Sequence, residues 1–431
     1  MKIAVVALGK IGLPLAVQFA NKGHHVIGCD VNQKTVDMIN AGNEPFPGEA
    51  HLDEYLKKVV ASGHLVATTD TKSAVAQVDA VVVVVPLFVD NDGVPDFGWM
   101  DAATEDIAKG LKVGTLVSYE TTLPVGTTRN RFAPALEKIS GLRAGVDFHL
   151  VFSPERVLTG RVFADLRKYP KLVGGIDDAS THAGIEFYKQ VLDFDDRPDL
   201  AQANGVWDMG SAEASEMAKL AETTYRDVNI GLANQFAIFA ETANIDISKV
   251  ISASNSQPFS HIHQPGIAVG GHCIPIYPRF YLWNHPEATV VRAAREANAA
   301  MPAHAVSILA DAMGSLKNKN VAVLGISYRG GVKESAFSGV FPTVNALTSA
   351  GANVFVHDPM YTDEEVTQLG FKVYAMGGAI DAVILQADHA EYKSLTSASF
   401  PGVRAIVDGR RSMNQSNFPG VEFRVIGAPA H

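Results

Sequence analysis

The sequence has few cysteines, no long apolar run and no excess of positive charge, and each absence excludes a class of protein. Only Cys29 and Cys273 occur in 431 residues, so a disulfide framework is excluded and a reducing cytoplasm is the expected location. No apolar stretch reaches the ~18 residues of a membrane span, so we expect no membrane association. We expect no signal peptide, because the first apolar run begins at residue 3. A formal net charge of −10 argues against a nucleic acid as the main partner. A local basic site on such an acidic protein could still bind an anionic small molecule.

The composition and length describe a globular protein with a large core. Apolar residues make up 47% of the chain and charged residues 19%, which is typical of a soluble protein. A length of 431 residues is enough for two or three domains.

The first residues follow the pattern of a dinucleotide-binding unit. A short apolar strand is followed by a glycine turn, a helix and a second strand that ends in Asp30. Gly9 would let the backbone approach a pyrophosphate, and Gly12 would let the helix pack on the strand. Asp30 would accept hydrogen bonds from a ribose 2′-hydroxyl, which favours NAD over NADP. Ala7 stands where the first glycine of the pattern belongs, and the alternative for Asp30 is a loop carboxylate that caps the next helix.

Three further buried strands are predicted within residues 79–86, 114–128 and 149–157, and the last is expected to run into the start of a helix. The intervening residues 88–100 read as a turn-rich loop. In an open α/β sheet, ligands bind beyond the carboxyl ends of the strands. The residues predicted at such ends are Pro86, Thr122 and Glu155.

Residues 211–243 contain no proline and no strand-like alternation, and they predict one long helix. Such a length suggests a spine between domains and a dimer surface. Lys219 lies among small and apolar neighbours on this helix, and the alternative to a functional role is a solvated lysine. The apolar face is expected to repeat every four residues through Leu220, Thr224, Val228, Leu232 and Phe236.

A second doubly wound unit is predicted after residue 300. Strands are expected near residues 320–331 and 352–359, with a helix between them and two more strands after them. This unit lacks the glycine pattern of the first, so a second NAD is not expected. Several residues near its predicted strand ends could form a binding site for a nucleotide diphosphate: Tyr328, Arg329, Lys333, Arg410 and Arg411. The alternative is that they are ordinary surface residues.

The second cysteine lies in an unusual loop. Residues 268–278 read AVGGHCIPIYP, so Cys273 follows a glycine pair and precedes a proline. A packing cysteine needs no such loop. A thiol that a substrate must approach closely does, so Cys273 is a candidate for contact with a substrate.

Eight motifs follow one another along nearly the whole chain: ALGKIGLPLA, DGVPD, TTLPVGTT, FSPERVLTGR, EASEMAKLAETTYRDVNI, HQPGIAVGGHCIP, VRAAREAN and LGISYR. Together and in this order they resemble the motifs of the nucleotide-sugar (UDP-sugar) 6-dehydrogenases. The form SPERVL-x-G resembles the branch that oxidises UDP-N-acetylhexosamines (UDP-ManNAc or UDP-GlcNAc) rather than UDP-glucose.

The resemblance implies an α/β fold with two Rossmann-like doubly wound domains joined by a long-helix central dimerisation region. Residues 1–200 would form the NAD-binding domain, 201–300 the dimerisation region with the cysteine loop, and 301–431 the UDP-sugar-binding domain. It also implies a cytoplasmic, metal-free homodimer in polysaccharide biosynthesis. C6 of the sugar would pass from alcohol to carboxylate with two NAD per turnover, through a thiohemiacetal and a thioester on Cys273.

The resemblance further assigns residues by matching position. The catalytic residues would be Cys273, Lys219 and Glu155. The cofactor would be bound by Gly9, Lys10, Ile11, Gly12, Asp30, Lys34, Pro86, Thr122 and Glu155. The substrate would be bound by Glu155, Arg156, Val157, Lys219, Thr223, Gly270, Gly271, Tyr328 and Arg329.

Four residues depart from those usual in the family. Thr223 replaces an asparagine, Tyr277 an aspartate, and Phe259 and Ala336 replace arginines. These departures leave open a nucleotide-sugar binder with impaired catalysis. A separate alternative is the same chemistry with UDP-glucose as the substrate.

Overall fold

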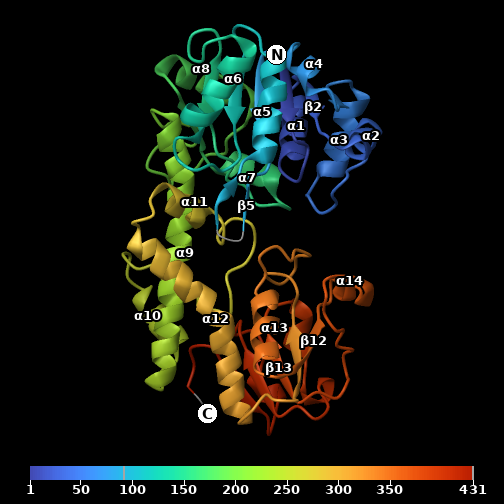
Figure 1. Cartoon of the computed structure of the whole chain (residues 1–431), viewed down its shortest axis with the longest axis vertical. Coiled ribbons are helices and arrows are strands. Elements are labelled where there is room, and N and C mark those ends of the chain that lie inside the picture. Colours follow the sequence, from blue (N-terminus) through green and yellow to red (C-terminus); the bar gives the residue numbers. More distant parts are fainter. Residues whose placement is uncertain (91–92, 430–431) are drawn as a thin grey trace. The chain divides into compact units, whose positions relative to one another are not determined.

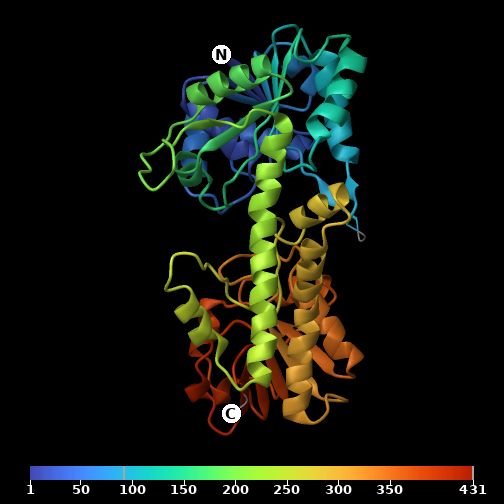
Figure 2. The same cartoon turned by 90° about the vertical axis from the view of Figure 1, so that its left-hand side faces the viewer.

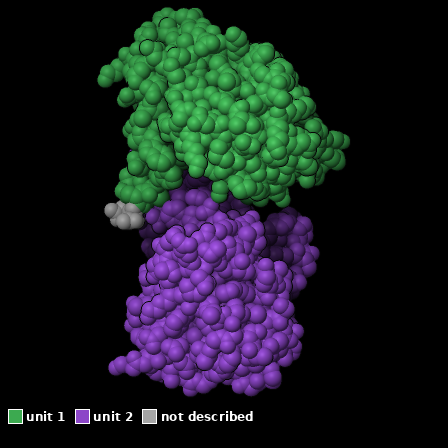
Figure 3. All heavy atoms as spheres, turned by 90° about the vertical axis from the view of Figure 1, so that its right-hand side faces the viewer, with its two compact units in different colours: residues 1–221 green, residues 222–431 purple. Residues whose placement is uncertain are grey.

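The computed structural model describes residues 1–90 and 93–429 of the chain. The chain divides into two compact units, residues 1–221 and residues 222–431, which Figure 3 colours separately. Each unit has its own sheet and its own buried apolar core. Within the described residues, no helix is both long and apolar enough to cross a membrane.

The first unit contains an eight-stranded sheet in the order β10-β9-β8-β7-β4-β1-β2-β3, counted over its described residues. All neighbouring strands are parallel except β8 and β9, which are antiparallel. Its strands are β1 (Lys2–Val6), β2 (His25–Cys29), β3 (Leu65–Thr68), β4 (Ala80–Val83), β7 (Leu116–Tyr119), β8 (His149–Phe152), β9 (Lys171–Gly175) and β10 (Val206–Asp208). Its helices are α1 (Gly12–Asn21), α2 (Gln33–Asn40), α3 (Leu52–Ala61), α4 (Thr71–Val75), α5 (Gly98–Gly110), η1 (Thr128–Phe132), α6 (Ala133–Ser140), α7 (Val162–Lys168) and α8 (Asp178–Val191) (Figure 1).

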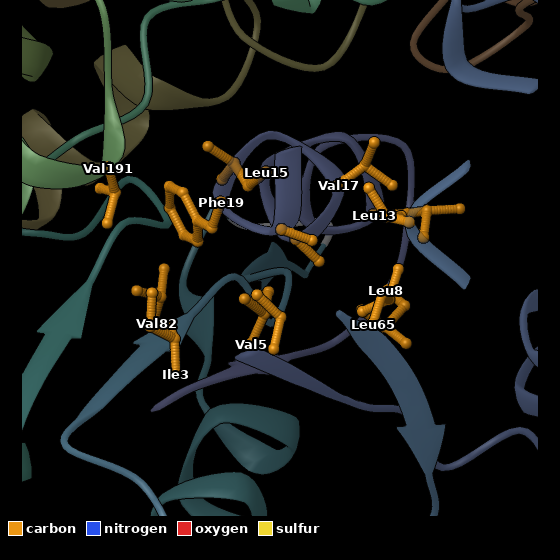
Figure 4. Packing of buried hydrophobic residues seen from close by; sticks show 14 of the residues in the cluster. Ile3, Val5, Leu8, Leu13, Leu15, Val17, Phe19, Leu65, Val82 and Val191 are labelled. Carbon is orange, nitrogen blue, oxygen red and sulfur yellow. The ribbon is translucent and has the colours of Figure 1, made fainter. Parts of the chain in front are cut away.

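Helices cover the sheet of the first unit, so its central strands are apolar on both faces. Every residue of β4 is buried, and so is every residue of β7. Leu13, Val17 and Phe19 of α1 belong to one buried apolar cluster with Val5 of β1 and Val82 of β4, and Figure 4 shows α1 lying over these strands. Burial of side chains of this size contributes roughly 1.5–3 kcal/mol each. This packing fixes α1 against β1 and with it the turn between them.

The sheet of the second unit has the order β12-β11-β13-β14-β15 in its described residues, and all its neighbours are parallel. Its strands are β11 (Asn320–Leu324), β12 (Asn353–His357), β13 (Ala382–Leu385), β14 (Ala405–Asp408) and β15 (Glu422–Val425). Its helices are α10 (Ile247–Ser254), α11 (Tyr277–Asn284), α12 (Thr289–Met313), α13 (Val340–Ser349), α14 (Asp363–Gln368), η2 (Ala390–Ser394), η3 (Ser397–Ser399) and η4 (Gln415–Asn417). The predicted class, α/β with two Rossmann-like doubly wound parts and a long central helix, is confirmed.

The long helix is α9 (Ala212–Thr242), and the boundary between the two units falls inside it (Figure 2). The predicted single apolar face is wrong. Leu220 is fully buried, whereas Leu232 is 48% exposed and Phe236 is 38% exposed. A repeat of four residues drifts by about 40° per step around a helix of 3.6 residues per turn, so it cannot stay on one face.

The predicted loop at residues 88–100 contains regular structure. Strand β5 (Phe88–Val89) pairs in antiparallel fashion with β6 (Pro95–Asp96), and α5 begins at Gly98. Part of this prediction, residues 91–92, lies outside the described residues. Strands of two residues are too short to produce an alternating pattern, which is why the sequence did not indicate them.

Candidate active site

The turn after β1 has the backbone shape of a dinucleotide-binding turn, although its first residue is alanine. Ala7 has a left-handed backbone with φ of 74°, which costs a residue with a Cβ roughly 1 kcal/mol. A Cβ on Gly12 would lie 1.9 Å from the Ala7 carbonyl oxygen, so only glycine lets α1 begin this close to the strand. Apart from Gly9 itself and its two chain neighbours, no described residue has an atom within 4 Å of the place that a Cβ on Gly9 would take. The turn, which includes Lys10 and Ile11, therefore has room for a pyrophosphate at the N-terminus of α1.

Asp30 follows β2 and braces the same turn. Its Oδ2 accepts a hydrogen bond from the Leu8 backbone N–H at 2.9 Å, and its Oδ1 accepts one from the Asn32 backbone N–H at 2.9 Å. A carboxylate offers roughly four acceptor sites, so capacity remains for ribose hydroxyls. The alternative that Asp30 caps the next helix is wrong, because Asn32 caps α2 by accepting from the backbone N–H groups of Lys34 and Thr35. The turn and the acid together fit NAD.

The predicted placement of Pro86, Thr122 and Glu155 at strand ends is confirmed. Each lies three residues beyond its strand, since β4 ends at residue 83, β7 at 119 and β8 at 152. These strands are adjacent and parallel, and β4 also pairs with β1. The three residues therefore share the sheet edge of the glycine turn.

A buried glutamate that the sequence analysis missed fixes the loop after Thr122. Glu216 of α9 is fully buried. Its Oε2 accepts from the Gly126 N–H at 2.5 Å, and its Oε1 accepts from the N–H and the hydroxyl of Thr128 at 2.9 and 2.7 Å. Burial raises the pKa of Glu216 to about 7, against the lowering effect of these hydrogen bonds. No local pattern distinguishes this residue from other helical glutamates.

Glu155 belongs to a buried ionic cluster that we define as Glu155, Lys171 and Glu120. The Lys171 ammonium donates to Glu155 Oε2 at 2.8 Å and to Glu120 Oε2 at 2.7 Å. Burial opposes ionisation of Glu155, but the nearby ammonium outweighs it, so the pKa of Glu155 is lowered. Burial raises the pKa of Glu120 to about 7. The sequence analysis missed Lys171 and Glu120; the available signals were a lysine at the start of a buried strand and an acid at the end of another.

The segment after β8 does not enter a helix directly, contrary to the prediction, because α7 begins only at Val162. Pro154 disfavours helical backbone in the residue before it. The helix begins instead where Glu49 reaches it, since Oε2 and Oε1 of Glu49 accept from the N–H groups of Gly160 and Val162 at 2.6 and 2.7 Å. The two other substrate candidates on this segment, Arg156 and Val157, are half-buried.

Lys219 and Thr223 lie one turn apart on α9. Lys219 is 8% exposed and Thr223 is 3% exposed. Lys219 is therefore not a solvated surface lysine, which was the alternative considered for it. Both positions remain candidates for substrate contact.

The loop of Cys273 packs against the long loop between β11 and α13, residues 325–339, within the second unit. Cys273 is exposed, whereas Cys29 is buried. The Gly271 N–H donates to the Ala336 carbonyl oxygen at 3.1 Å. A Cβ on Gly270 would lie 2.5 Å from the Tyr328 Cβ, so glycine is required for this close contact. The structure thus places Tyr328 against Gly270 and Gly271 of the Cys273 loop.

Most of the predicted basic cradle is already engaged. Lys333 forms an ion pair with Glu365 at 2.6 Å, and Arg411 forms one with Asp246 at 2.8 Å. Arg410 donates to the main-chain carbonyl oxygens of Gln386 and Tyr328 at 2.7 and 3.2 Å. Arg329 is exposed and stacks on the neighbouring Tyr328 ring at 5.7 Å.

Comparisons with known proteins cover nearly the whole chain. Residues 1–192 match the NAD binding domain of the UDP-glucose/GDP-mannose dehydrogenase family, residues 213–300 its central domain and residues 322–415 its UDP binding domain. A UDP-N-acetyl-D-mannosamine dehydrogenase from Pyrococcus horikoshii is 34% identical over 440 residues, which cover 99% of each chain.

Solved structures agree with these matches. A UDP-D-ManNAc dehydrogenase from Pyrococcus horikoshii aligns with a TM-score of 0.87 and 32% identity over 99% of both chains. A UDP-glucose dehydrogenase from Pyrobaculum islandicum aligns with a TM-score of 0.86 and 25% identity over 99% of this chain and 98% of that one. The resemblance seen in the motifs is thereby confirmed, as is NAD as the cofactor. The chain belongs to the UDP-glucose/GDP-mannose dehydrogenase family and is an NAD-dependent UDP-sugar dehydrogenase.

Proposed function

We propose that this protein oxidises C6 of a UDP-N-acetylhexosamine, UDP-ManNAc or UDP-GlcNAc, to the UDP-uronate, with Cys273 as the covalent nucleophile. The observation that carries this proposal is the exposed Cys273 on a glycine loop that packs against Tyr328. The motif SPERVL-x-G and the relative named for UDP-N-acetyl-D-mannosamine support a 2-acetamido sugar.

The chemistry explains why a thiol is needed. Bound NAD accepts a hydride in each of two oxidations of C6. The first gives an aldehyde, which has no hydroxyl at C6 from which a second oxidation can start. Addition of the Cys273 sulfur to the aldehyde carbon forms a thiohemiacetal, and its oxidation leaves a thioester. Water then attacks the thioester carbon, the C–S bond breaks, and the carboxylate and the thiol are released.

Other residues would support these steps. Lys219 would hold the C6 oxygen or its proton, and Glu155 would take the proton of the attacking water. The glycine turn from Gly9 to Gly12, together with Asp30 and Thr122, would hold NAD. Backbone N–H groups of the glycine loop would face the developing oxyanion.

The test is a panel of UDP-sugars incubated with NAD. We expect UDP-ManNAc or UDP-GlcNAc to yield two NADH for each uronate formed, and UDP-glucose to react much more slowly. Oxidation that ignores the 2-acetamido group would instead favour the alternative of a UDP-glucose dehydrogenase. Binding of NAD and UDP-sugar by calorimetry without any NADH would favour an impaired binder, which the departures at Thr223, Tyr277, Phe259 and Ala336 motivate.

A homodimer is part of this proposal. Helix α9 exposes Tyr225 (54%), Leu232 (48%), Phe236 (38%) and Phe239 (67%), which recur at helical spacing. An apolar stripe of this kind is typical of a helix that packs against a partner. Light scattering should give twice the chain mass, and Phe239→Asp should shift it towards the monomer. The division at residues 1–200, 201–300 and 301–431, and a cytoplasmic location, also remain proposals.

A further inference from the structure

The ionic cluster of Glu155, Lys171 and Glu120 contains two residues to which the proposed chemistry assigns no role. Side-chain exposure falls from 11% for Glu155 to 4% for Lys171 and 0% for Glu120. Lys171 and Glu120 therefore lie behind Glu155, away from solvent. A buried ion pair is seldom more stabilising than well-packed apolar residues of the same volume. Packing alone does not explain why the sheet keeps three ionisable groups here.

The geometry of the cluster fixes the orientation of Glu155. Its Oε2 accepts from Lys171 at 2.8 Å, and its Oε1 accepts from the Arg156 backbone N–H at 2.8 Å. The Glu155 N–H donates to the Glu120 carbonyl oxygen at 3.2 Å, so backbone and side chain are both held. Each oxygen of Glu155 keeps acceptor capacity, because a carboxylate offers roughly four acceptor sites.

The inner end of the cluster is closed by Tyr188 of α8. The Tyr188 hydroxyl donates to Glu120 Oε1 at 2.6 Å and lies 2.7 Å from the Ser118 hydroxyl. The Lys171 ammonium also lies 4.8 Å from the centroid of the Tyr188 ring. Glu120 is thus held between Lys171 and Tyr188, with both of its oxygens hydrogen-bonded.

The charges of the cluster do not cancel unless one carboxyl holds a proton. Two carboxylates and one ammonium leave one excess negative charge, which is unfavourable in a buried site. Glu120 is the more deeply buried acid, and burial raises its pKa to about 7. Burial acts in the same direction on Glu155, but the ammonium of Lys171 outweighs it and the pKa of Glu155 is lowered. The proton therefore resides on Glu120 near neutral pH, and Glu155 is the ionised acid.

We propose that Lys171 and Glu120 are positioning residues of the oxidation, which hold the Glu155 carboxylate ionised and fixed in orientation for the hydrolytic water. This inference rests on the proposed function, since it assumes that Glu155 accepts the proton of that water. The water gives its proton to Glu155 as its oxygen bonds to the thioester carbon and the C–S bond breaks. Lys171 keeps Glu155 ready for this step, and Glu120, which holds a proton, accepts from Lys171 without adding a second negative charge to the buried site.

The test compares Lys171→Met with Lys171→Arg in the NADH assay over a range of pH. Lys171→Met removes the ammonium, so the pKa of Glu155 should rise and less Glu155 should be ionised at neutral pH. We expect kcat to fall about 10- to 100-fold near pH 7 and to recover as pH rises, with KM values within about twofold, because an adjacent opposite charge lowers a carboxyl pKa by 1–3 units. Lys171→Arg keeps the charge and should keep the wild-type shape of the pH profile.

A matched control is Glu186→Gln. Glu186 forms an exposed pair with Lys189 on the outer side of α8, close in sequence to Tyr188, and its side chain is 48% exposed. This variant should leave kcat and its pH profile unchanged. A purely structural role for Lys171 predicts instead that Lys171→Met lowers kcat equally at all pH values, and that result would overturn the inference.

Infrared difference spectroscopy gives a readout that needs no turnover. The wild-type protein should show the band of a buried carboxylic acid that disappears as pH rises through about 7, and part of this band should be missing in Glu120→Gln. An unchanged band in Glu120→Gln would contradict the inference. Wild-type turnover on the sugar panel reports separately on the proposed function, so a failure of one is distinguishable from a failure of the other.

Discussion

The two sheets place an acid at the same point after their second strand, but only the first leaves it available to a ligand. Asp30 is half-buried and accepts from two backbone N–H groups. Asp358, which follows β12, is 2% exposed, accepts from three backbone N–H groups and contacts the His389 ring at 3.1 Å. The position of an acid after a strand therefore does not define its role. Asp358 is an internal brace of the second unit.

The two units also differ in the length of the segment between their first strand and the helix that follows it. In the first unit, α1 begins six residues after β1 ends, from residue 6 to residue 12. In the second, α13 begins sixteen residues after β11 ends, from residue 324 to residue 340. The first turn thus presents a helix N-terminus close to the strand end. The longer loop of the second unit instead contacts the Cys273 loop through Tyr328.

The largest effect should separate the two thiols, one in each unit. Cys273→Ser should lower the rate of uronate formation at least about 10³-fold, as expected for a covalent nucleophile. Cys29 is 1% exposed at the end of β2, and burial raises its pKa to about 12, so it stays a thiol and is unreactive. Cys29→Ala should retain turnover and lose only stability. Equal turnover in wild type and Cys273→Ser, measured by chromatography of the uronate, would show that the reaction needs no covalent bond to Cys273.

The two acids can be compared directly. Asp30→Asn should raise the KM for NAD about 10- to 100-fold, because a hydrogen bond to a charged group contributes roughly 1.5–3 kcal/mol. Asp358→Asn should leave the KM for NAD near the wild-type value and lower the free energy of unfolding by about 2–3 kcal/mol, since an amide NH₂ would face buried N–H donors. NAD titration and chemical denaturation of both variants decide this. A loss of NAD affinity in Asp358→Asn as large as in Asp30→Asn would contradict the contrast.

Stability should respond to pH in opposite ways through acids of the two units. The pKa of Glu216 in the first unit is raised to about 7 in the folded state, so its contribution is present below its unfolded pKa of about 4.5 and is lost as pH rises through 7. The pKa of Asp358 is lowered: burial acts against this, but the hydrogen bonds from His389 and from the backbone N–H groups of Met360 and Ser327 outweigh it, so its contribution is lost only as pH falls.

Glu216→Gln should therefore flatten the decline of unfolding free energy between pH about 4.5 and 7 by on the order of 2–3 kcal/mol. Chemical denaturation of wild type and variant at several pH values measures this. The exposed Glu186→Gln serves as the control and should keep the wild-type decline. An identical decline in Glu216→Gln would show that this acid titrates normally.

The smallest effect concerns the first residue of each turn. Ala7 has φ of 74°, whereas Gly325 occupies the corresponding place after β11 with φ of 105°. Ala7→Gly should raise the unfolding free energy by up to about 1 kcal/mol, because it removes left-handed strain. Gly325→Ala should lower it by more, since its Cβ would lie 2.4 Å from the Ala387 Cβ. Thermal unfolding of the pair measures the contrast, and a destabilised Ala7→Gly would contradict the strain argument.

Local patterns were sufficient to predict much of the fold. Short apolar runs, and the glycine, proline or polar residues that follow them, predicted the glycine turn, Asp30 and the strand ends at Pro86, Thr122 and Glu155. Lys171 was not predictable in this way, because it reaches Glu155 only through the antiparallel pairing of β9 with β8, which no local pattern specifies. The helix cap by Glu49 depends likewise on a contact across more than a hundred residues. Such contacts are made by tertiary pairing, and a single sequence does not display them.

The account depends most on covalent attachment of the sugar to one sulfur. The most direct measurement is peptide mass mapping after the wild-type protein, NAD and UDP-ManNAc are mixed and quenched in acid during turnover. We predict a mass increase of one UDP-sugar acyl group on the peptide that contains Cys273, and none on the peptide that contains Cys29. Continued NADH formation with an unmodified Cys273 peptide at every time point would contradict the account.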